Sequence, residues 1–131
     1  HQKIDQILII ASQENKKSIQ KKIVDSKVQI VLGGSSRFNS VCAAYNFLER
    51  KKDDILLIHN GANPFLSPED INTALEKAKE KGASGAGRKE TSTLRTQEKG
   101  ILDRKKLWEM ETPQALREDI FEQGRKSISE K

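Results

Sequence analysis

The sequence has little of what builds disulfide-bonded proteins or base-stacking surfaces. Its 131 residues include one cysteine, one tryptophan and one tyrosine, and aromatic residues make up 5% of the chain. A single cysteine, Cys42, excludes both an internal disulfide framework and a cluster of cysteine metal ligands. This usage favours a reducing, cytoplasmic setting. The shortage of aromatic side chains argues against nucleic acid as a partner.

Long hydrophobic runs are also missing, and charge takes their place. The apolar run from Ile7 to Ala11 is too short for a membrane span or a signal peptide, so no membrane partner is expected. Charged residues make up 33% of the chain, with a net charge of +5 and a pI near 9.4. Such a balance suits an anionic partner, which could be a phosphorylated small molecule or nucleic acid.

The segment from Ile55 to Phe65 predicts a strand, a polar loop and then a helix. Four apolar residues, Ile55 to Ile58, are typical of a strand buried in the middle of a parallel sheet. Gly61 and the neighbouring asparagines favour a loop. A helix is expected after Ser67, because Pro68 suits its first position and Asp70 completes a capping box.

Strands and helices alternate along the chain, which predicts an α/β fold with a mostly parallel sheet flanked by helices. Strands are expected at residues 4–11, 27–32, 55–58 and 83–87, and helices after Ser12, around Val41 to Leu48, after Ser67 and from Thr112. We expect one domain over residues 1–131. Residues 88–106 are polar and lack helical periodicity, so they predict an arm that protrudes from the sheet. Trp108, just beyond it, is expected to be packed.

Two loops could bind an anion. Glycines in Gly33-Gly34-Ser35-Ser36-Arg37 would let backbone amides at a helix N-terminus face an anion, and Arg37 could add a charged bond. This loop matches neither a Walker loop nor a dinucleotide fingerprint, and a simple turn is an equal alternative. Thr112 is expected to cap the last helix, whose N-terminus could receive a phosphate. His59 closes an apolar strand and is expected to be structural.

The order of these motifs resembles the methylerythritol phosphate cytidylyltransferase family. The resemblance rests on four segments spread from about Ile4 to Phe121: Gly33-Gly34-x-x-Arg37-x-x-Ser40, His59-x-x-Ala62-x-Pro64-Phe65, Asp103-Arg104-x-x-Leu107-Trp108 and Thr112-Pro113-Gln114. It implies a Rossmann-like sheet and an arm, at 88–106, that exchanges contacts in a homodimer. It also implies transfer of CMP from CTP to a polyol phosphate, with Mg²⁺ and release of pyrophosphate.

The resemblance also implies roles for individual residues. The expected nucleotide-binding residues combine those implied by the resemblance with those of the loop at residues 33–37. They are Gly33, Gly34, Arg37, Ser40, Asn60 and Gly61. The substrate phosphate is expected to contact Arg104, Thr112, Thr91 and Asn63. No metal-ligating side chain is predicted. The family's catalytic Arg and Lys are expected upstream of His1, so the chain looks like a fragment that would be inactive by itself.

Two departures from the family pattern leave the substrate open. Asn60 and Asn63 stand where the family usually has Asp and Arg, and Asn63 cannot make a bidentate phosphate contact. Methylerythritol phosphate is the expected acceptor, for isoprenoid precursor synthesis. The alternatives are a ribitol-type polyol phosphate, an inactive nucleotide-binding module, or a basic α/β domain that binds RNA.

Overall fold

The computed structural model describes residues 2–129, and the chain divides into two compact units, residues 1–50 and 51–131. Among the described residues no helix has the length and apolar character needed to cross a membrane. The first unit contains two strands and two helices: β1 (Ile7–Ala11), α1 (Gln13–Gln20), β2 (Val28–Leu32) and α2 (Arg37–Phe47).

Strands β1 and β2 of the first unit pair in parallel, as the alternating pattern predicts. Ala11 lies opposite Leu32 in this pairing. Both helices begin after a serine cap, because the Ser12 hydroxyl accepts from the Asn15 amide at 3.3 Å and the Ser36 hydroxyl from the Asn39 amide at 3.1 Å. The second cap starts α2 at Arg37, four residues before the apolar pattern at Val41. The buried side chains of this unit are Ala11, Ala44 and Tyr45.

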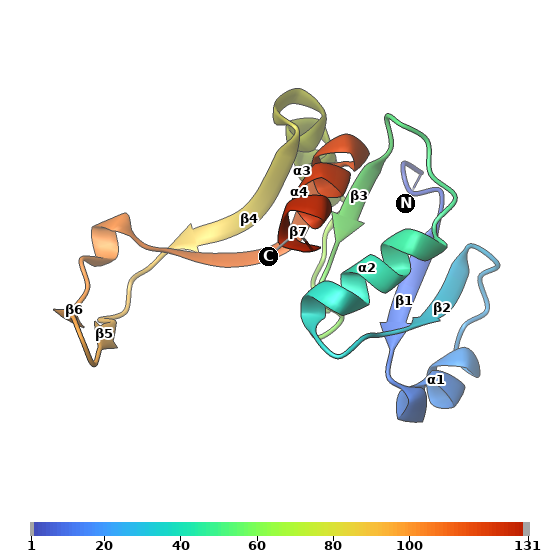
Figure 1. Ribbon diagram of the computed structural model, residues 1–131, viewed down its shortest axis with the longest axis horizontal. Coiled ribbons are helices and arrows are strands. Elements are labelled where there is room, and N and C mark those ends of the chain that lie inside the picture. Colours follow the sequence, from blue (N-terminus) through green and yellow to red (C-terminus); the bar gives the residue numbers. More distant parts are fainter. Residues whose placement is uncertain (1, 130–131) are drawn as a thin grey trace. The chain divides into compact units, whose positions relative to one another are not determined.

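The second unit is an antiparallel sheet with helices and a long arm (Figure 1). Its elements are β3 (Ile55–Ile58), α3 (Pro68–Lys81), β4 (Ala83–Lys89), β5 (Arg95–Thr96), β6 (Gly100–Ile101), the short 3-10 helix η1 (Arg104–Lys106), β7 (Trp108–Arg117) and α4 (Glu118–Ser129). Helix α3 has the predicted capping box between Ser67 and Asp70, and Gly82 ends it with a φ of 90°. Alanines of α3 pack on Ala115 of β7, so helix and sheet approach closely.

The α/β class is confirmed, but the pairing predicted for residues 55–58 is wrong within this unit. The sheet order is β3-β7-β4, so β3 is an edge strand there, and its described partner β7 is antiparallel, with Leu57 opposite Ala115. The physical reason is the path of the chain. Strand β4 leads out into the arm and β7 returns from it, so the returning strand lies between β3 and β4 in the opposite direction.

The helix predicted from Thr112 is also wrong, because Thr112 and Pro113 lie in β7 and α4 begins at Glu118. Proline has no amide to donate and is tolerated in sheets at bulges. Pairing of β7 with β3 ends at Gln114, opposite Ile58. Pairing of β7 with β4 is irregular between Gly85 and Gly87. Pro113 therefore lies where no regular ladder bond is lost, and strand pairing of residues 114–117 overrides the local helix signal.

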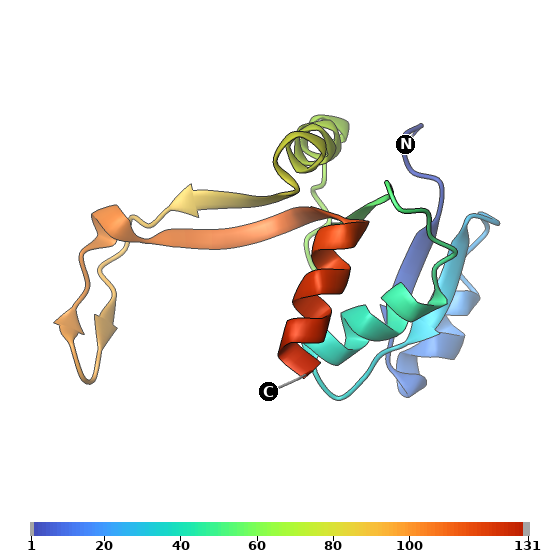
Figure 2. The ribbon, with the colours of Figure 1, turned by 45° about the horizontal axis from the view of Figure 1, so that its top comes forward.

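The predicted arm at residues 88–106 is confirmed as a protrusion of the second unit. Strands β4 and β7 run side by side away from α3, and the β5–β6 hairpin lies near the tip in both ribbon views (Figures 1 and 2). Near the base, the Arg88 guanidinium donates to Glu109 at 2.8 Å and lies 3.3 Å from a Glu111 oxygen. The hydrogen bond to Glu109 and the two carboxylate charges raise the pKa of Arg88.

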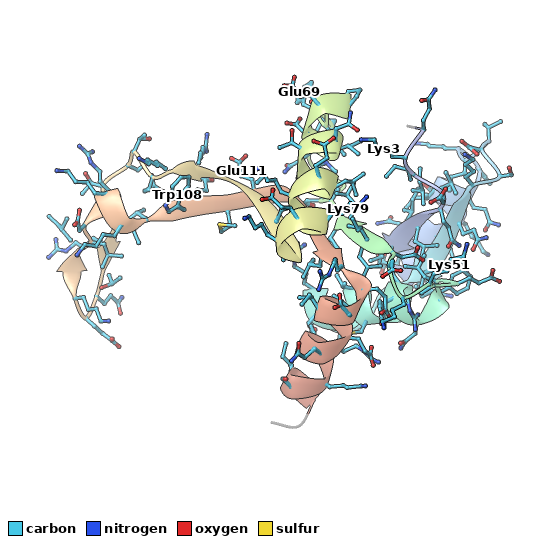
Figure 3. All side chains as sticks on the ribbon, turned by 90° about the horizontal axis from the view of Figure 1, so that it is seen from above. Lys3, Lys51, Glu69, Lys79, Trp108 and Glu111 are labelled. Atoms are coloured by element: carbon cyan, nitrogen blue, oxygen red, sulfur yellow. The ribbon has the colours of Figure 1, made fainter. Side chains whose placement is uncertain are left out.

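Trp108 is not packed as expected. It is the first residue of β7, just beyond the arm, and is 57% exposed, with the Lys89 ammonium 5.9 Å from the centre of its ring (Figure 3). Lys89 is its cross-strand partner in the register of β4 and β7. The tryptophan is exposed because a two-stranded ribbon has no third layer that could cover it.

Candidate functional site

The glycine loop of the first unit lies between β2 and α2. The Gly33 amide donates to the Ala11 carbonyl at 3.0 Å, and the Gly34 amide donates to the Ser40 hydroxyl at 3.0 Å. A Cβ on Gly34 would lie 2.6 Å from the Cβ of Asn39, so only glycine fits there. Both glycine amides thus have partners inside the chain. Anion binding by this loop stays a prediction, and Arg37, the exposed first residue of α2, is the side chain that could carry it.

The loop after β3 is a compact turn of the second unit. The Asn60 side-chain oxygen accepts from the Ala62 amide at 3.3 Å, and the Asn60 carbonyl accepts from the Asn63 amide at 2.9 Å. The His59 Nε2 atom lies 2.8 Å from the Asn63 carbonyl oxygen. A Cβ on Gly61 would meet no atom within 4 Å, so the face of the turn at Gly61 is open. Three of the predicted site residues, Asn60, Gly61 and Asn63, therefore share one ordered turn.

Strand β7 adds Thr112 to this turn. The Asn60 backbone amide donates to the Thr112 hydroxyl at 3.2 Å. This bond places a predicted nucleotide-binding residue beside a predicted phosphate-binding residue. Because the hydroxyl oxygen accepts here, its own proton can be donated to an acceptor such as a phosphate oxygen. Sequence reasoning missed the contact, since its partners lie in separate segments and no local pattern couples them.

The remaining phosphate candidates lie in the arm. Arg104 is in η1, and its guanidinium donates to the Thr91 carbonyl at 2.9 Å. Next to Thr91, the Glu90 carboxylate accepts from the Ser92 amide at 2.6 Å, and this bond lowers the pKa of Glu90. Arg104 and Thr91 are thus in contact and both are exposed, and their binding of a phosphate stays a prediction.

The arm pair and Thr112 are separated along the strand. Thr112 lies beyond the start of β7 at Trp108, and a strand rises about 3.3 Å per residue, so it is roughly 13 Å farther along. The predicted phosphate residues therefore form two groups in one chain: Arg104 with Thr91 in the arm, and Thr112 with Asn60 and Asn63 at the sheet.

The described residues do not contain a metal centre of their own. Among residues 2–129, no group of three or more His, Cys, Asp or Glu side chains could hold a metal ion. Cys42 is a free, half-buried thiol. The second unit offers hydrogen-bond donors at Asn60 and Thr112 and a cation at Arg104.

Comparison with known proteins places this geometry in a family. The family model described as "IspD: 2-C-methyl-D-erythritol 4-phosphate cytidylyltransferase" matches residues 1–131. A curated relative from Thermotoga neapolitana, with the same enzyme name, is 34% identical over 125 residues, 92% of this chain and 56% of that protein. The chain thus spans about half the length of the curated relatives it matches.

Two solved structures resemble the chain closely in fold. The Francisella tularensis 2-C-methyl-D-erythritol 4-phosphate cytidylyltransferase has a TM-score of 0.83 and 27% identity, over 97% of this chain and 60% of that one. The Anaerococcus prevotii 4-diphosphocytidyl-2C-methyl-D-erythritol synthase has a TM-score of 0.85 at 18% identity, over 98% and 59%, a likeness of fold alone. With the family model matched from end to end, the chain belongs to the IspD family, the 2-C-methyl-D-erythritol 4-phosphate cytidylyltransferases.

Proposed function

We propose that the full-length protein transfers CMP from CTP to a polyol phosphate, with methylerythritol phosphate as the acceptor. The observation that carries this proposal is the 3.2 Å hydrogen bond from the Asn60 amide to the Thr112 hydroxyl. It joins the turn that would contact the nucleotide to the strand that would contact the acceptor phosphate. Within a chain of this family, such a junction is where the two substrates would meet.

The chemistry joins two anions. An oxygen of the polyol phosphate attacks the α-phosphorus of CTP, a new P–O bond forms, and the bond to the pyrophosphate breaks. Such a reaction needs positioning and charge neutralisation more than proton transfer. The net charge of +5 suits two anionic substrates. In this proposal Asn60 and Gly61 of the second unit bind the nucleotide, and Arg104, Thr91, Thr112 and Asn63 bind the acceptor. The nucleotide contacts expected of Gly33, Gly34, Arg37 and Ser40 in the first unit stay predictions.

We further propose that the protein is a homodimer assembled through the arm. The arm and the adjoining start of β7 expose four large apolar side chains in an otherwise polar surface, namely Leu94, Ile101, Trp108 and Met110, at 39%, 70%, 57% and 63%. Apolar groups of this size are costly to leave in water, and a second copy would cover them. The separation of Arg104 from Thr112 within one chain supports the same conclusion, since a partner's arm could supply the missing cation to the sheet.

Magnesium is part of the proposal only as a companion of the nucleotide. The described residues do not form a protein-only magnesium site, and the ion usually takes several ligands from substrate phosphates and water. We therefore assign no residue of this chain to it.

The test is pyrophosphate release by the full-length protein with CTP and Mg²⁺. Methylerythritol phosphate and ribitol phosphate would be compared as acceptors, with CTP alone as the control. Release with methylerythritol phosphate supports the proposal, and faster release with ribitol phosphate would change the acceptor. No release with either acceptor would overturn the enzyme assignment. In that case, an RNA affinity that falls steeply with salt and does not change when CTP is added would favour the RNA-binding alternative.

A further inference from the structure

His59 occupies a special place in the turn that follows β3. Its Nε2 atom lies 2.8 Å from the carbonyl oxygen of Asn63, four residues on. A carbonyl oxygen can only accept, so Nε2 must carry the proton of this bond. In the neutral ring Nδ1 is then the unprotonated nitrogen, and it is buried without a hydrogen-bond partner among the described residues. The surroundings therefore select one tautomer of the imidazole.

The hydrogen bond between His59 and Asn63 is one of several that hold Asn60 in place. Inside the turn, Asn60 accepts from the Asn63 amide through its carbonyl and from the Ala62 amide through its side chain. From outside, its own amide is held by Thr112. His59 joins the start of the turn to its end, so it limits the freedom of Asn60 and Gly61. Preorganised donors bind more tightly, because less entropy is lost on binding.

We propose that His59 is a positioning residue for the nucleotide: its Nε2–H bond to Asn63 holds Asn60 and Gly61 in the geometry that receives CTP. The inference rests on the proposed function, because it takes CTP as the ligand of the turn. It assigns this histidine a role in positioning instead of proton transfer. The role depends on the position of one donor atom, so it can be separated from a general need for a ring at this half-buried position.

Three substitutions distinguish that donor from the bulk of the ring. In His59→Gln the amide nitrogen lies as many bonds from Cβ as Nε2 does, so the donor is kept. In His59→Asn the amide nitrogen takes the place of Nδ1 and cannot reach the Asn63 carbonyl. In His59→Phe a ring of similar size remains without any donor. Ser67→Ala is the matched control, since Ser67 caps α3 a few residues beyond the turn and contacts none of its groups in the described hydrogen bonds.

The readouts are CTP affinity by calorimetry and steady-state kinetics of the full-length protein. His59→Gln should bind CTP within about twofold of the parent. His59→Asn and His59→Phe should bind about three- to tenfold more weakly, the loss expected for one neutral hydrogen bond. Their KM for CTP should rise while kcat stays nearly constant. Ser67→Ala should lower the melting temperature and leave CTP affinity unchanged.

Two measurements on the turn itself complete the test. Nitrogen NMR of the parent should show the imidazole proton on Nε2, and amide exchange at Ala62 and Asn63 should accelerate in His59→Phe but not in His59→Gln. A proton on Nδ1, or a His59→Phe protein that binds CTP like the parent, would overturn the proposal while the enzyme assignment stands. A parent that binds no CTP would overturn the proposed function and this role with it.

Discussion

The backbone amide of Asn60 donates a 3.2 Å hydrogen bond to the hydroxyl of Thr112, across 52 positions of sequence. The bond forms where β3 ends and β7 continues past it, so it marks the point at which the regular ladder gives way to side-chain contacts. It gives Thr112 two roles, as an acceptor that fixes the turn and as a donor that faces the proposed phosphate.

Thr112→Val keeps the shape of the side chain and removes its oxygen. The Asn60 amide then loses its partner, and we expect a loss of about 0.5–1.5 kcal/mol in the free energy of unfolding. Thr112→Ser keeps the hydroxyl and should stay close to the parent. Denaturant unfolding and amide exchange at Asn60 measure the effect. Unchanged exchange at Asn60 in the valine variant would contradict this role of the hydroxyl.

Arg104→Ala should weaken binding of the polyol phosphate about ten- to a hundredfold. A charged hydrogen bond to phosphate is worth roughly 1.5–3 kcal/mol, and ~1.4 kcal/mol corresponds to one decade. CTP affinity should change little, because Arg104 is assigned to the other substrate. Lys105→Ala is the matched control, an exposed cation in the same short helix. An Arg104→Ala protein with the parent's KM and kcat would contradict the assignment of Arg104 to the acceptor phosphate.

Asn63→Arg should tighten binding of the polyol phosphate, because it adds a guanidinium beside the Thr112 group. The backbone amide and carbonyl of Asn63 make the turn's hydrogen bonds, so the substitution should preserve the loop. Ala62→Arg adds the same charge one position away and serves as the control. KM values for methylerythritol phosphate and ribitol phosphate are the measurement. Lower activity on the native acceptor would mean that the Asn63 side-chain amide hydrogen-bonds to a hydroxyl group of the acceptor instead.

Shortening the arm should convert the proposed dimer into a folded monomer. Lys89 and Trp108 are cross-strand partners, so residues 90–107 can be replaced by an Asn-Gly turn at that point. The variant should also lose binding of the acceptor, since Arg104 and Thr91 go with the arm. Light scattering reports the mass, and circular dichroism checks the fold.

Point substitutions test the same dimer without removing the arm. Trp108→Ser with Met110→Ser removes two exposed apolar side chains and should weaken association while the ribbon stays paired. A shortened variant that remains dimeric would show that the arm does not hold the copies together.

Local signals in the sequence were sufficient for elements that depend on near neighbours. The caps at Ser12 and Ser67 began helices where predicted, because a side-chain oxygen satisfies an amide only three residues away. The strand at Ile55 to Ile58 has the predicted bounds, since four apolar residues between polar segments leave little choice. The four motifs, taken together, were also enough to indicate the family.

The candidate site was predictable only in part. Asn60, Gly61 and Asn63 are close in sequence and share one turn, and Arg104 donates to the Thr91 carbonyl, two residues that the resemblance had named for the same phosphate. The distance between the Arg104–Thr91 contact and the turn at Asn60 was not predictable, because it follows from how far the paired strands extend into the arm. The internal bonds of the Gly33 and Gly34 amides were likewise decided by Ala11 and Ser40.

Adjacent or regularly spaced residues were enough to predict the α/β class and the helix caps. A polar stretch without periodicity indicated the arm, and the order of four separate motifs indicated the family. Only the tertiary structure decided that Thr112 and Pro113 belong to a strand. Locally they form a good helix start, but pairing of residues 114–117 with β3 and of 114–116 with β4 satisfies more backbone groups than one extra helical turn could. The same pairing brings the Thr112 hydroxyl to the Asn60 amide, and so builds the proposed site.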